Sequence, residues 1–230
     1  MKLLLVRHGE TFANDAQRWS GSQDLEITNL TENGIEQAKK LATWFKNNNF
    51  IPTHIYVSPQ KRALDTFHLA GDHWNIKPNI INELKETSAG NFEGHTWDEI
   101  EELFPQEADG FRFTRNWDVV TGAETELERR NRGVKILNIA LNHTSKEDIV
   151  IMFCHASIIG NIVAAILETP KLWGIRTRNT AIFEFEIEPE KWNDTSREKN
   201  NLTLWRILRF NETPHLENED KDLSNLGSQI

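Results

Sequence analysis

The chain has 230 residues, an ordinary globular composition and a formal net charge of −9, which argues against nucleic acid or an anionic membrane as its main partner. No apolar run approaches the ~20 residues that span a bilayer, and the single cysteine, Cys154, cannot form an internal disulfide, so a reducing, cytoplasmic setting is the simplest one. An anionic substrate would therefore have to bind in a local positive pocket of an acidic protein.

Short apolar runs alternate along the chain with amphipathic stretches, a pattern typical of a sheet covered by helices. The first run, Leu3 to Val6, is shorter than the roughly 7–15 apolar residues of a signal peptide and stops at Arg7-His8, so we interpret it as a buried strand. The other expected strands lie at 54–57, 76–81, 148–154, 180–187 and 202–210. The expected helices lie at 31–47, 58–73, 97–104, 123–143 and 158–167, with loops mainly at 12–30 and 82–94.

Three expectations concern the ends and faces of these helices. Ser58 and Pro59 are predicted to be the N-cap and the first residue of the helix at 58–73. Pro105 is predicted to end the helix at 97–104. In the helix at 123–143, the residues expected to face inward are Leu127, Val134, Leu137 and Leu141.

The sequence holds no internal repeat and no composition break that would mark a linker. We therefore expect one domain at 1–210, with a helical insertion at about 95–121. The tail at 211–230 is polar and acidic and is expected to be poorly ordered. The predicted fold is a three-layer α/β/α sandwich, in which helices cover both faces of a mostly parallel, mixed sheet.

Two of the predicted strands share one design, an apolar run followed by a histidine, which gives His8 and His155. Parallel strands finish at the same edge of a sheet, where open α/β folds bind their ligands, so the two imidazoles are expected to meet. With Arg7 and Arg62 they suit phosphate, because arginine offers forked donors and neutral histidine can attack phosphorus. The alternative is that one histidine is a satisfied core or capping residue and that Arg62 faces water.

Competing catalytic motifs are missing from the sequence. A cysteine phosphatase loop needs an arginine six positions after its cysteine, but Gly160 stands there after Cys154. The chain contains no phosphate-binding P-loop, no Gly-x-Ser-x-Gly elbow, no His-Glu-x-x-His motif and no Cys-x-x-Cys pair. We therefore predict no metal site and no cofactor.

The stretch Arg7-His8-Gly9-Glu10-Thr11 resembles the signature of the histidine phosphatase superfamily, the phosphoglycerate mutase-like proteins. Further motifs of that family recur in the same order over residues 2–185. They are Asn14; Arg18, Ser20 and Gly21 of a substrate loop; 58–63 with Thr66; 84–86 with Gly90 and 93–94; 122–125 with Arg132; His155; and Asn179-Thr180. Thr125 and Ala156 depart from the usual Ser and Gly of the family.

The resemblance implies a mechanism. His8 would be the nucleophile that forms a phosphohistidine, while Arg7, Arg62 and His155 neutralise the phosphoryl oxygens. Glu86 would protonate the leaving alcohol and then activate water, which requires an apolar or anionic setting that keeps the carboxyl protonated. The positions that the resemblance assigns to substrate binding are Arg7, Asn14, Ser20, Gly21, Arg62, Glu86 and Ala156.

The interval 95–121 bears on the choice between phosphatase and mutase. In the mutases a long, basic insertion at this place covers phosphoglycerate, whereas this interval is short and holds only Arg112 and Arg115 among seven acidic residues. We therefore favour a metal-independent, histidine acid phosphatase-type hydrolase of a small phosphorylated metabolite, with inorganic phosphate as product. A homodimer is one possible assembly. The alternatives are mutase-type phosphoryl transfer and a weakly active regulatory member that binds a phosphorylated ligand.

Overall fold

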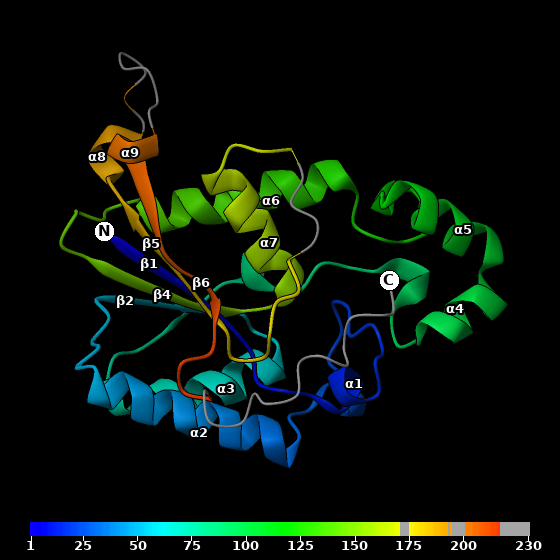
Figure 1. Ribbon diagram of the computed structural model, residues 1–230, viewed down its shortest axis with the longest axis horizontal. Helices are drawn as coiled ribbons and strands as arrows, with labels where there is room; N and C mark the ends of the chain where they lie inside the picture. The colour runs from blue at the N-terminus through cyan, green and yellow to red at the C-terminus, as the bar shows by residue number, and fades with distance from the viewer. Residues whose placement is uncertain (171–174, 193, 195–200, 217–230) are drawn as a thin grey trace.

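The structure is a computed structural model that describes residues 1–170, 175–192, 194 and 201–216. Within these residues, a mixed sheet of six strands has the order β3-β2-β4-β1-β5-β6 (Figure 1). The strands β3, β2, β4 and β1 run parallel, whereas β5 is antiparallel to both β1 and β6. The strands are β1 Lys2–Arg7, β2 His54–Val57, β3 Asn79–Ile80, β4 Ile149–Cys154, β5 Ile182–Ile187 and β6 Trp205–Glu212.

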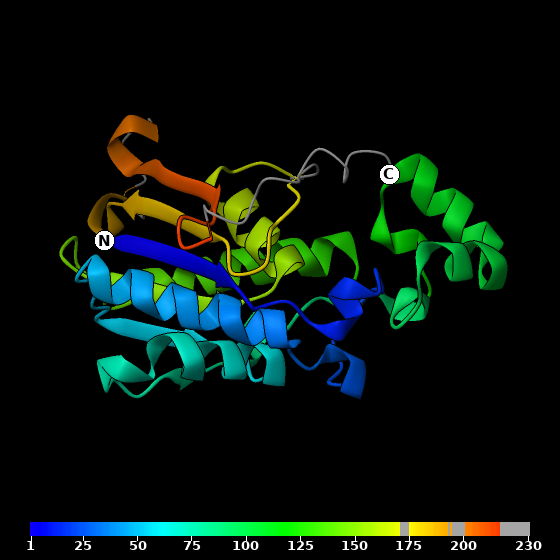
Figure 2. The same cartoon turned by 60° about the horizontal axis from the view of Figure 1, so that its bottom comes forward.

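Helices cover both faces of the sheet, which confirms the predicted three-layer α/β/α sandwich. One face carries α2 Glu32–Asn47 and α3 Lys61–Gly71, and the other carries α6 Glu126–Leu141 and α7 Ala156–Ile166 (Figures 1 and 2). Alternate residues of β1 point to opposite faces. Leu3 and Leu5 therefore pack with the α6–α7 layer, whereas Leu4 and Val6 pack with the α2–α3 layer.

Two helices lie at one end of the molecule, beyond the carboxyl end of β1 (Figures 1 and 2). They are α4 Trp97–Leu103 and α5 Pro105–Thr114, and Phe92, Phe111 and Trp117 form a small apolar core beneath them. The remaining helices are short: α1 Phe12–Asp15, α8 Pro189–Trp192 and α9 Asn201–Leu204. Single 3₁₀ turns occupy Glu26–Thr28, Asp72–Trp74, Asn82–Leu84, Gly90–Phe92 and Trp117–Val119.

One predicted helix start is wrong, and one predicted helix end is confirmed. The helix α3 begins at Lys61 with Gln60 as its N-cap, whereas the Ser58 hydroxyl accepts from the Gln60 N–H at 3.3 Å and also contacts His155. Pro105 follows the end of α4, as predicted, and is also the first residue of α5. Proline is suited to this place because the first turn of a helix needs no N–H donor from it.

The predicted inward face of α6 is partly wrong. Leu137 and Leu141 are buried, but Leu127 and Val134 are 63% and 44% exposed. The first turns of α6 face polar loops, and the buried positions there are Arg129 and Gly133. A Cβ at Gly133 would lie 2.4 Å from the Asn161 carbonyl oxygen of α7, so this glycine permits the close crossing of the two helices.

The tail is better ordered at its start than the sequence predicts. Asn211 and Glu212 complete β6, Thr213 is buried, and the His215 Nε2 lies 2.8 Å from the Thr180 hydroxyl. The expectation of poor order is thus wrong for 211–216, and the rest of the tail, 217–230, lies outside the described residues. Among the residues that the structure describes, no helix has the length and apolarity needed to cross a membrane.

Candidate active site

The carboxyl ends of three adjacent parallel strands bring the predicted residues together. Arg7 pairs with Cys154 in the register of β1 and β4, and Val57 pairs with Phe153 in that of β2 and β4. The residues that follow these strand ends are His8, His155 and Ser58. The two imidazole rings are buried with their centroids 5.2 Å apart, as the rule for parallel strands predicts.

Only one ring nitrogen of His8 has a hydrogen-bond partner among the described residues. Its Nδ1 lies 2.7 Å from the carbonyl oxygen of Gly9, so Nδ1–H donates to that carbonyl and Nε2 carries the lone pair. Burial, with the charges of Arg7 and Arg62, holds the pKa of His8 well below its usual value. The ring is therefore neutral at neutral pH, which is the form that can attack phosphorus.

The backbone around His8 is fixed by distant parts of the chain. The Gly9 N–H donates to the Thr66 hydroxyl of α3 at 2.9 Å, and the Asn179 side chain donates to the His8 carbonyl at 3.3 Å. Asn179 also donates to the side-chain oxygen of Asn14 at 2.9 Å. Asn14 therefore lies within the bonded surroundings of His8, where the resemblance placed a substrate-binding residue.

Arg62 is fully buried at the start of α3. Its Nε donates to the His155 Nδ1 at 3.2 Å and its Nη2 donates to the Gly21 carbonyl at 2.9 Å. Its Nη1 lies 3.6 Å from a carboxylate oxygen of Asp24 and makes no hydrogen bond with the described residues. One N–H face of this guanidinium is therefore open to an acceptor.

Arg7 offers a second open donor. Its Nη1 donates to the Thr177 carbonyl, while its buried Nε has no hydrogen-bond partner in the described part of the chain. Burial lowers the pKa of Arg7 to about 10, so the side chain stays cationic at neutral pH. Buried donors are nearly always satisfied in native proteins, and oxygens of a tetrahedral anion would satisfy both arginines.

His155 is bonded through both ring nitrogens. Nδ1 accepts from Arg62, so the proton lies on Nε2, which donates to the Ser58 hydroxyl at 2.8 Å. Burial, followed by the charge of Arg62, holds the pKa of His155 well below its usual value. A phosphoryl oxygen would reach this ring only in exchange for one of its present contacts.

Glu86 lies at the edge of the same site. Its carboxylate accepts from the Thr87 N–H at 2.8 Å and from the Ser157 N–H at 3.2 Å. Ser157 belongs to the first turn of α7, where free backbone N–H groups favour negative charge. The expected apolar or anionic setting is therefore wrong, because N–H donors hold Glu86. Burial lowers the pKa of Arg7 and Arg62, and the charge of Glu86 acts in the opposite direction by raising it.

The comparisons with known proteins agree with this geometry. The family model of the histidine phosphatase superfamily (branch 1) matches residues 3–198. The chain belongs to this superfamily. A glucosyl-3-phosphoglycerate phosphatase of Mycolicibacterium vanbaalenii is 27% identical over 74% of this chain and 75% of its own. A metal-independent phosphoserine phosphatase of Arabidopsis thaliana is 28% identical over 83% and 78%.

Solved structures of the superfamily share the fold. A mutant phosphoserine phosphatase from Entamoeba histolytica, in complex with phosphoserine, superposes with a TM-score of 0.73 at 26% identity and covers 94% of this chain and 98% of its own. The curated relatives also include proteins described as phosphoglycerate mutases. Family membership therefore establishes a phosphatase or mutase type of enzyme.

Three further residues singled out from the histidine phosphatase motifs are Arg18, Ser20 and Ala156. Arg18 grips Glu99 of α4 with two hydrogen bonds of 2.6 and 2.7 Å and also donates to the Gly94 carbonyl. Ser20 precedes Gly21 in the loop that receives Arg62. Ala156, in place of the usual glycine, opens the first turn of α7.

Gln60 is a buried residue that links two parts of this histidine phosphatase site, and no sequence pattern indicated that role. Its side-chain oxygen accepts from the Glu86 N–H at 2.6 Å, and its side-chain nitrogen lies 3.5 Å from the Gly21 carbonyl. Gln60 thereby ties the loop of the predicted acid to the loop that receives Arg62. Among the described residues, no group of three or more His, Cys, Asp or Glu side chains is placed to hold a metal ion.

Gly21 is required both by its backbone angle and by its neighbour. Its φ is +62°, and a Cβ would lie 2.1 Å from the carboxyl carbon of Glu93. Glu93 cannot easily move, because it accepts from Ser22 N–H, from the Ser22 hydroxyl and from Ala89 N–H at 3.0–3.1 Å. Gly21 must therefore stay small if its carbonyl is to receive Arg62.

We expect Gly21→Ala to lower the free energy of unfolding by about 2–3 kcal/mol, from positive-φ strain together with the clash. Denaturant unfolding measures this loss. Gly94→Ala is the matched control, because Gly94 has a φ of +82° but a Cβ added there would meet no other atom within 4 Å, and it should lose only about 1 kcal/mol. Equal losses in the two variants would contradict the role of the Glu93 contact.

Proposed function

We propose that this histidine phosphatase is a metal-independent phosphomonoesterase of the acid phosphatase type, which transfers the phosphoryl group of a small metabolite to His8 and then to water. One observation carries the proposal: the neutral His8 presents a bare Nε2 in a site where Arg7 and Arg62 each retain a buried N–H without a hydrogen-bond partner in the described residues. That combination suits an electrophile with several anionic oxygens.

In the first step, Nε2 of His8 attacks phosphorus, so that an N–P bond forms while the bond to the ester oxygen breaks. The Gly9 carbonyl, which accepts the Nδ1–H, stabilises the positive charge that grows on the imidazole. Arg7 and Arg62 stabilise the negative phosphoryl oxygens. His155 orients Arg62, because its Nδ1 accepts a hydrogen bond from the Nε of that arginine. Fixed charges of this kind are the main catalytic element in phosphoryl transfer.

Glu86 supplies the proton that the leaving alkoxide needs. The N–H groups of Thr87 and Ser157 hold its carboxyl at the edge of the site. In the second step water attacks the phosphohistidine, the N–P bond breaks, and Glu86 takes back a proton as inorganic phosphate forms.

The contacts of the basic side chains in and near α4 and α5 support a phosphatase rather than a mutase. Arg112 forms an ion pair with Glu101 and lies over the Trp97 ring at 5.4 Å, and Arg115 lies over the Phe111 ring at 5.9 Å. Arg18 is occupied by Glu99. A phosphoglycerate mutase must bind a second anionic group of its substrate. Within the described residues, these three arginines instead contact carboxylates and aromatic rings of the protein itself.

The test is hydrolysis of p-nitrophenyl phosphate and of a panel of phosphorylated metabolites, each with and without a chelator. We expect release of inorganic phosphate, with kcat/KM changed by less than about twofold on chelation because arginines take the electrostatic role. Dependence on added divalent metal would contradict the mechanism. Interconversion of phosphoglycerate isomers without phosphate release would favour a mutase, and ligand binding without turnover would favour a regulatory protein.

A further inference from the structure

The loop at 85–88 carries Glu86 without the support of a helix or strand. It lies between the 3₁₀ turns Asn82–Leu84 and Gly90–Phe92, and both carboxylate oxygens of Glu86 depend on N–H donors of Thr87 and Ser157. Proton transfer requires close placement of the acid, since a displacement of about 1 Å can lower a rate about 10²-fold. The loop must therefore be held by its neighbours.

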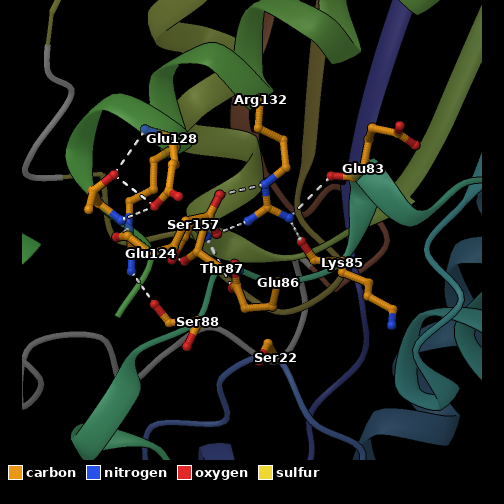
Figure 3. Close-up of polar contacts among 12 residues, drawn as sticks. Ser22, Glu83, Lys85, Glu86, Thr87, Ser88, Glu124, Glu128, Arg132 and Ser157 are labelled. Carbon is orange, nitrogen blue, oxygen red and sulfur yellow. Dashed lines mark hydrogen bonds and ion pairs between the residues drawn. The ribbon is translucent and has the colours of Figure 1, made fainter. Parts of the chain in front are cut away.

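Arg132 of α6 holds the residues before Glu86. Its Nη1 donates to the Lys85 carbonyl at 2.6 Å and to the Glu83 carbonyl at 3.3 Å (Figure 3). Its other two nitrogens donate to both carboxylate oxygens of Glu124, with Nε at 2.8 Å. The paired contacts with Glu124 fix the plane of the guanidinium, so its third nitrogen meets the loop backbone in a set direction.

Arg129, one turn earlier on α6, holds the residues after Glu86. Its Nη1 donates to the Thr87 hydroxyl at 2.7 Å and its Nη2 donates to the Ser88 carbonyl. Its Nε donates to the Glu124 carbonyl at 2.7 Å, and its guanidinium lies 4.1 Å from the centre of the Trp117 ring. The side chain is 4% exposed, and burial lowers its pKa to about 10, so it is a buried cation at neutral pH.

The two guanidinium groups thus donate hydrogen bonds to the loop on both sides of Glu86. Among the described residues, neither group is hydrogen-bonded to Glu86, His8, Arg7 or Arg62. Both anchor on Glu124, Arg132 through the carboxylate and Arg129 through the carbonyl. Thr87 connects this support to the acid directly, because its hydroxyl receives Arg129 while its N–H donates to the Glu86 carboxylate.

We propose that Arg129 and Arg132 are positioning residues for the proton-transfer steps, and that they act on the reaction through the placement of the Glu86 carboxyl. The inference rests on the proposed function, since it assumes that Glu86 protonates the leaving group. A role in fold stability alone would lower the rate for all substrates alike. A positioning role lowers it most for substrates whose leaving group must be protonated.

The leaving group supplies the readout. p-Nitrophenolate leaves readily without a proton, whereas the alkoxide of glycerol phosphate requires one, so a misplaced acid harms the second substrate more. We expect Arg132→Lys to lower kcat/KM about 10²-fold for glycerol phosphate and only about threefold for p-nitrophenyl phosphate. Lysine keeps the charge, but a single ammonium group cannot reproduce the planar fork on Glu124 and the loop.

A second variant keeps the test independent of folding losses. Thr87→Val removes only the hydroxyl that receives Arg129, and it should produce the same selective loss on glycerol phosphate. Arg130→Lys is the matched control, because Arg130 is an exposed residue of the same helix and should leave both substrates unchanged. Thermal unfolding of each variant reports stability separately.

The decisive comparison places Arg132→Lys in a Glu86→Gln background. If Arg132 acts through Glu86, the selective loss on glycerol phosphate should not increase further in the double variant. Equal losses on both substrates in the single variants, or an additive loss in the double variant, would overturn the proposal. If Glu86→Gln itself shows no selectivity for the leaving group, the assignment of Glu86 is wrong and the proposal is overturned with it.

Discussion

Replacement of His8 by alanine is expected to lower kcat for phosphomonoester hydrolysis at least about 10⁴-fold, as for the loss of other enzymatic nucleophiles. The reason is that Nε2 of His8 is the ring nitrogen left bare, since Nδ1 is committed to Gly9 and both nitrogens of His155 are engaged. Steady-state hydrolysis of p-nitrophenyl phosphate measures the loss.

The control for this variant is His68→Ala. His68 is an exposed histidine of α3 that contacts Asp72, and its removal should leave kcat unchanged. Because Arg7 and Arg62 remain in His8→Ala, calorimetric titration with inorganic phosphate should still detect binding and so show that the site is folded. Turnover of His8→Ala within about tenfold of the wild type would exclude His8 as the nucleophile.

Replacement of Arg62 by lysine is expected to lower kcat about 10²–10³-fold, the cost of removing one preorganised donor to a developing anion. Arg62 contacts His155 and Gly21 while keeping Nη1 open. A lysine ammonium keeps the charge but lacks the planar fork, so it cannot hold these contacts and bind a phosphoryl oxygen at the same time.

The neighbouring Lys61 provides the matched control for Arg62. It precedes Arg62 on α3, is exposed, and forms an ion pair with Asp65, so Lys61→Met should retain wild-type kinetics. Comparison of kcat and KM for the same substrate separates lost transition-state stabilisation from lost binding. A kcat of Arg62→Lys within about threefold of the wild type would show that the forked N–H donors of Arg62 do not stabilise the transition state.

The centre of the site could be predicted from the sequence because it depends on strand topology. An apolar run followed by histidine occurs twice, and the rule that parallel strands end at one edge brings His8 and His155 together. Arg62 and Glu86 required the family motifs, since an arginine in a first helical turn or a loop carboxylate is ordinarily a surface group. In the structure Arg62 contacts His155, and Glu86 accepts from the N–H of Ser157, two residues after His155.

The parts that could not be predicted depend on contacts between distant segments. Arg129 was missed because a hydropathy pattern assigns arginine to the solvent face, and Leu127 was expected inside in its place. Ser58 had the pattern of a helix cap, but α3 begins only at Lys61, and the Ser58 hydroxyl also contacts His155 from a distant strand end. His215 follows the last strand in the polar tail, and its ring contacts Thr180, a residue 35 positions earlier. None of these contacts has a periodic signal in the sequence.

The proposed reaction passes through a covalent phosphohistidine on His8, and the direct test is to trap that intermediate. A radiolabelled phosphomonoester is mixed with the enzyme, the reaction is quenched rapidly in alkali, and the labelled peptide is mapped by mass spectrometry. We expect an acid-labile, alkali-stable phosphoryl group on His8 that is absent from His8→Ala. Phosphate release without any labelled protein in the wild type, or a label on a residue other than His8, would contradict it.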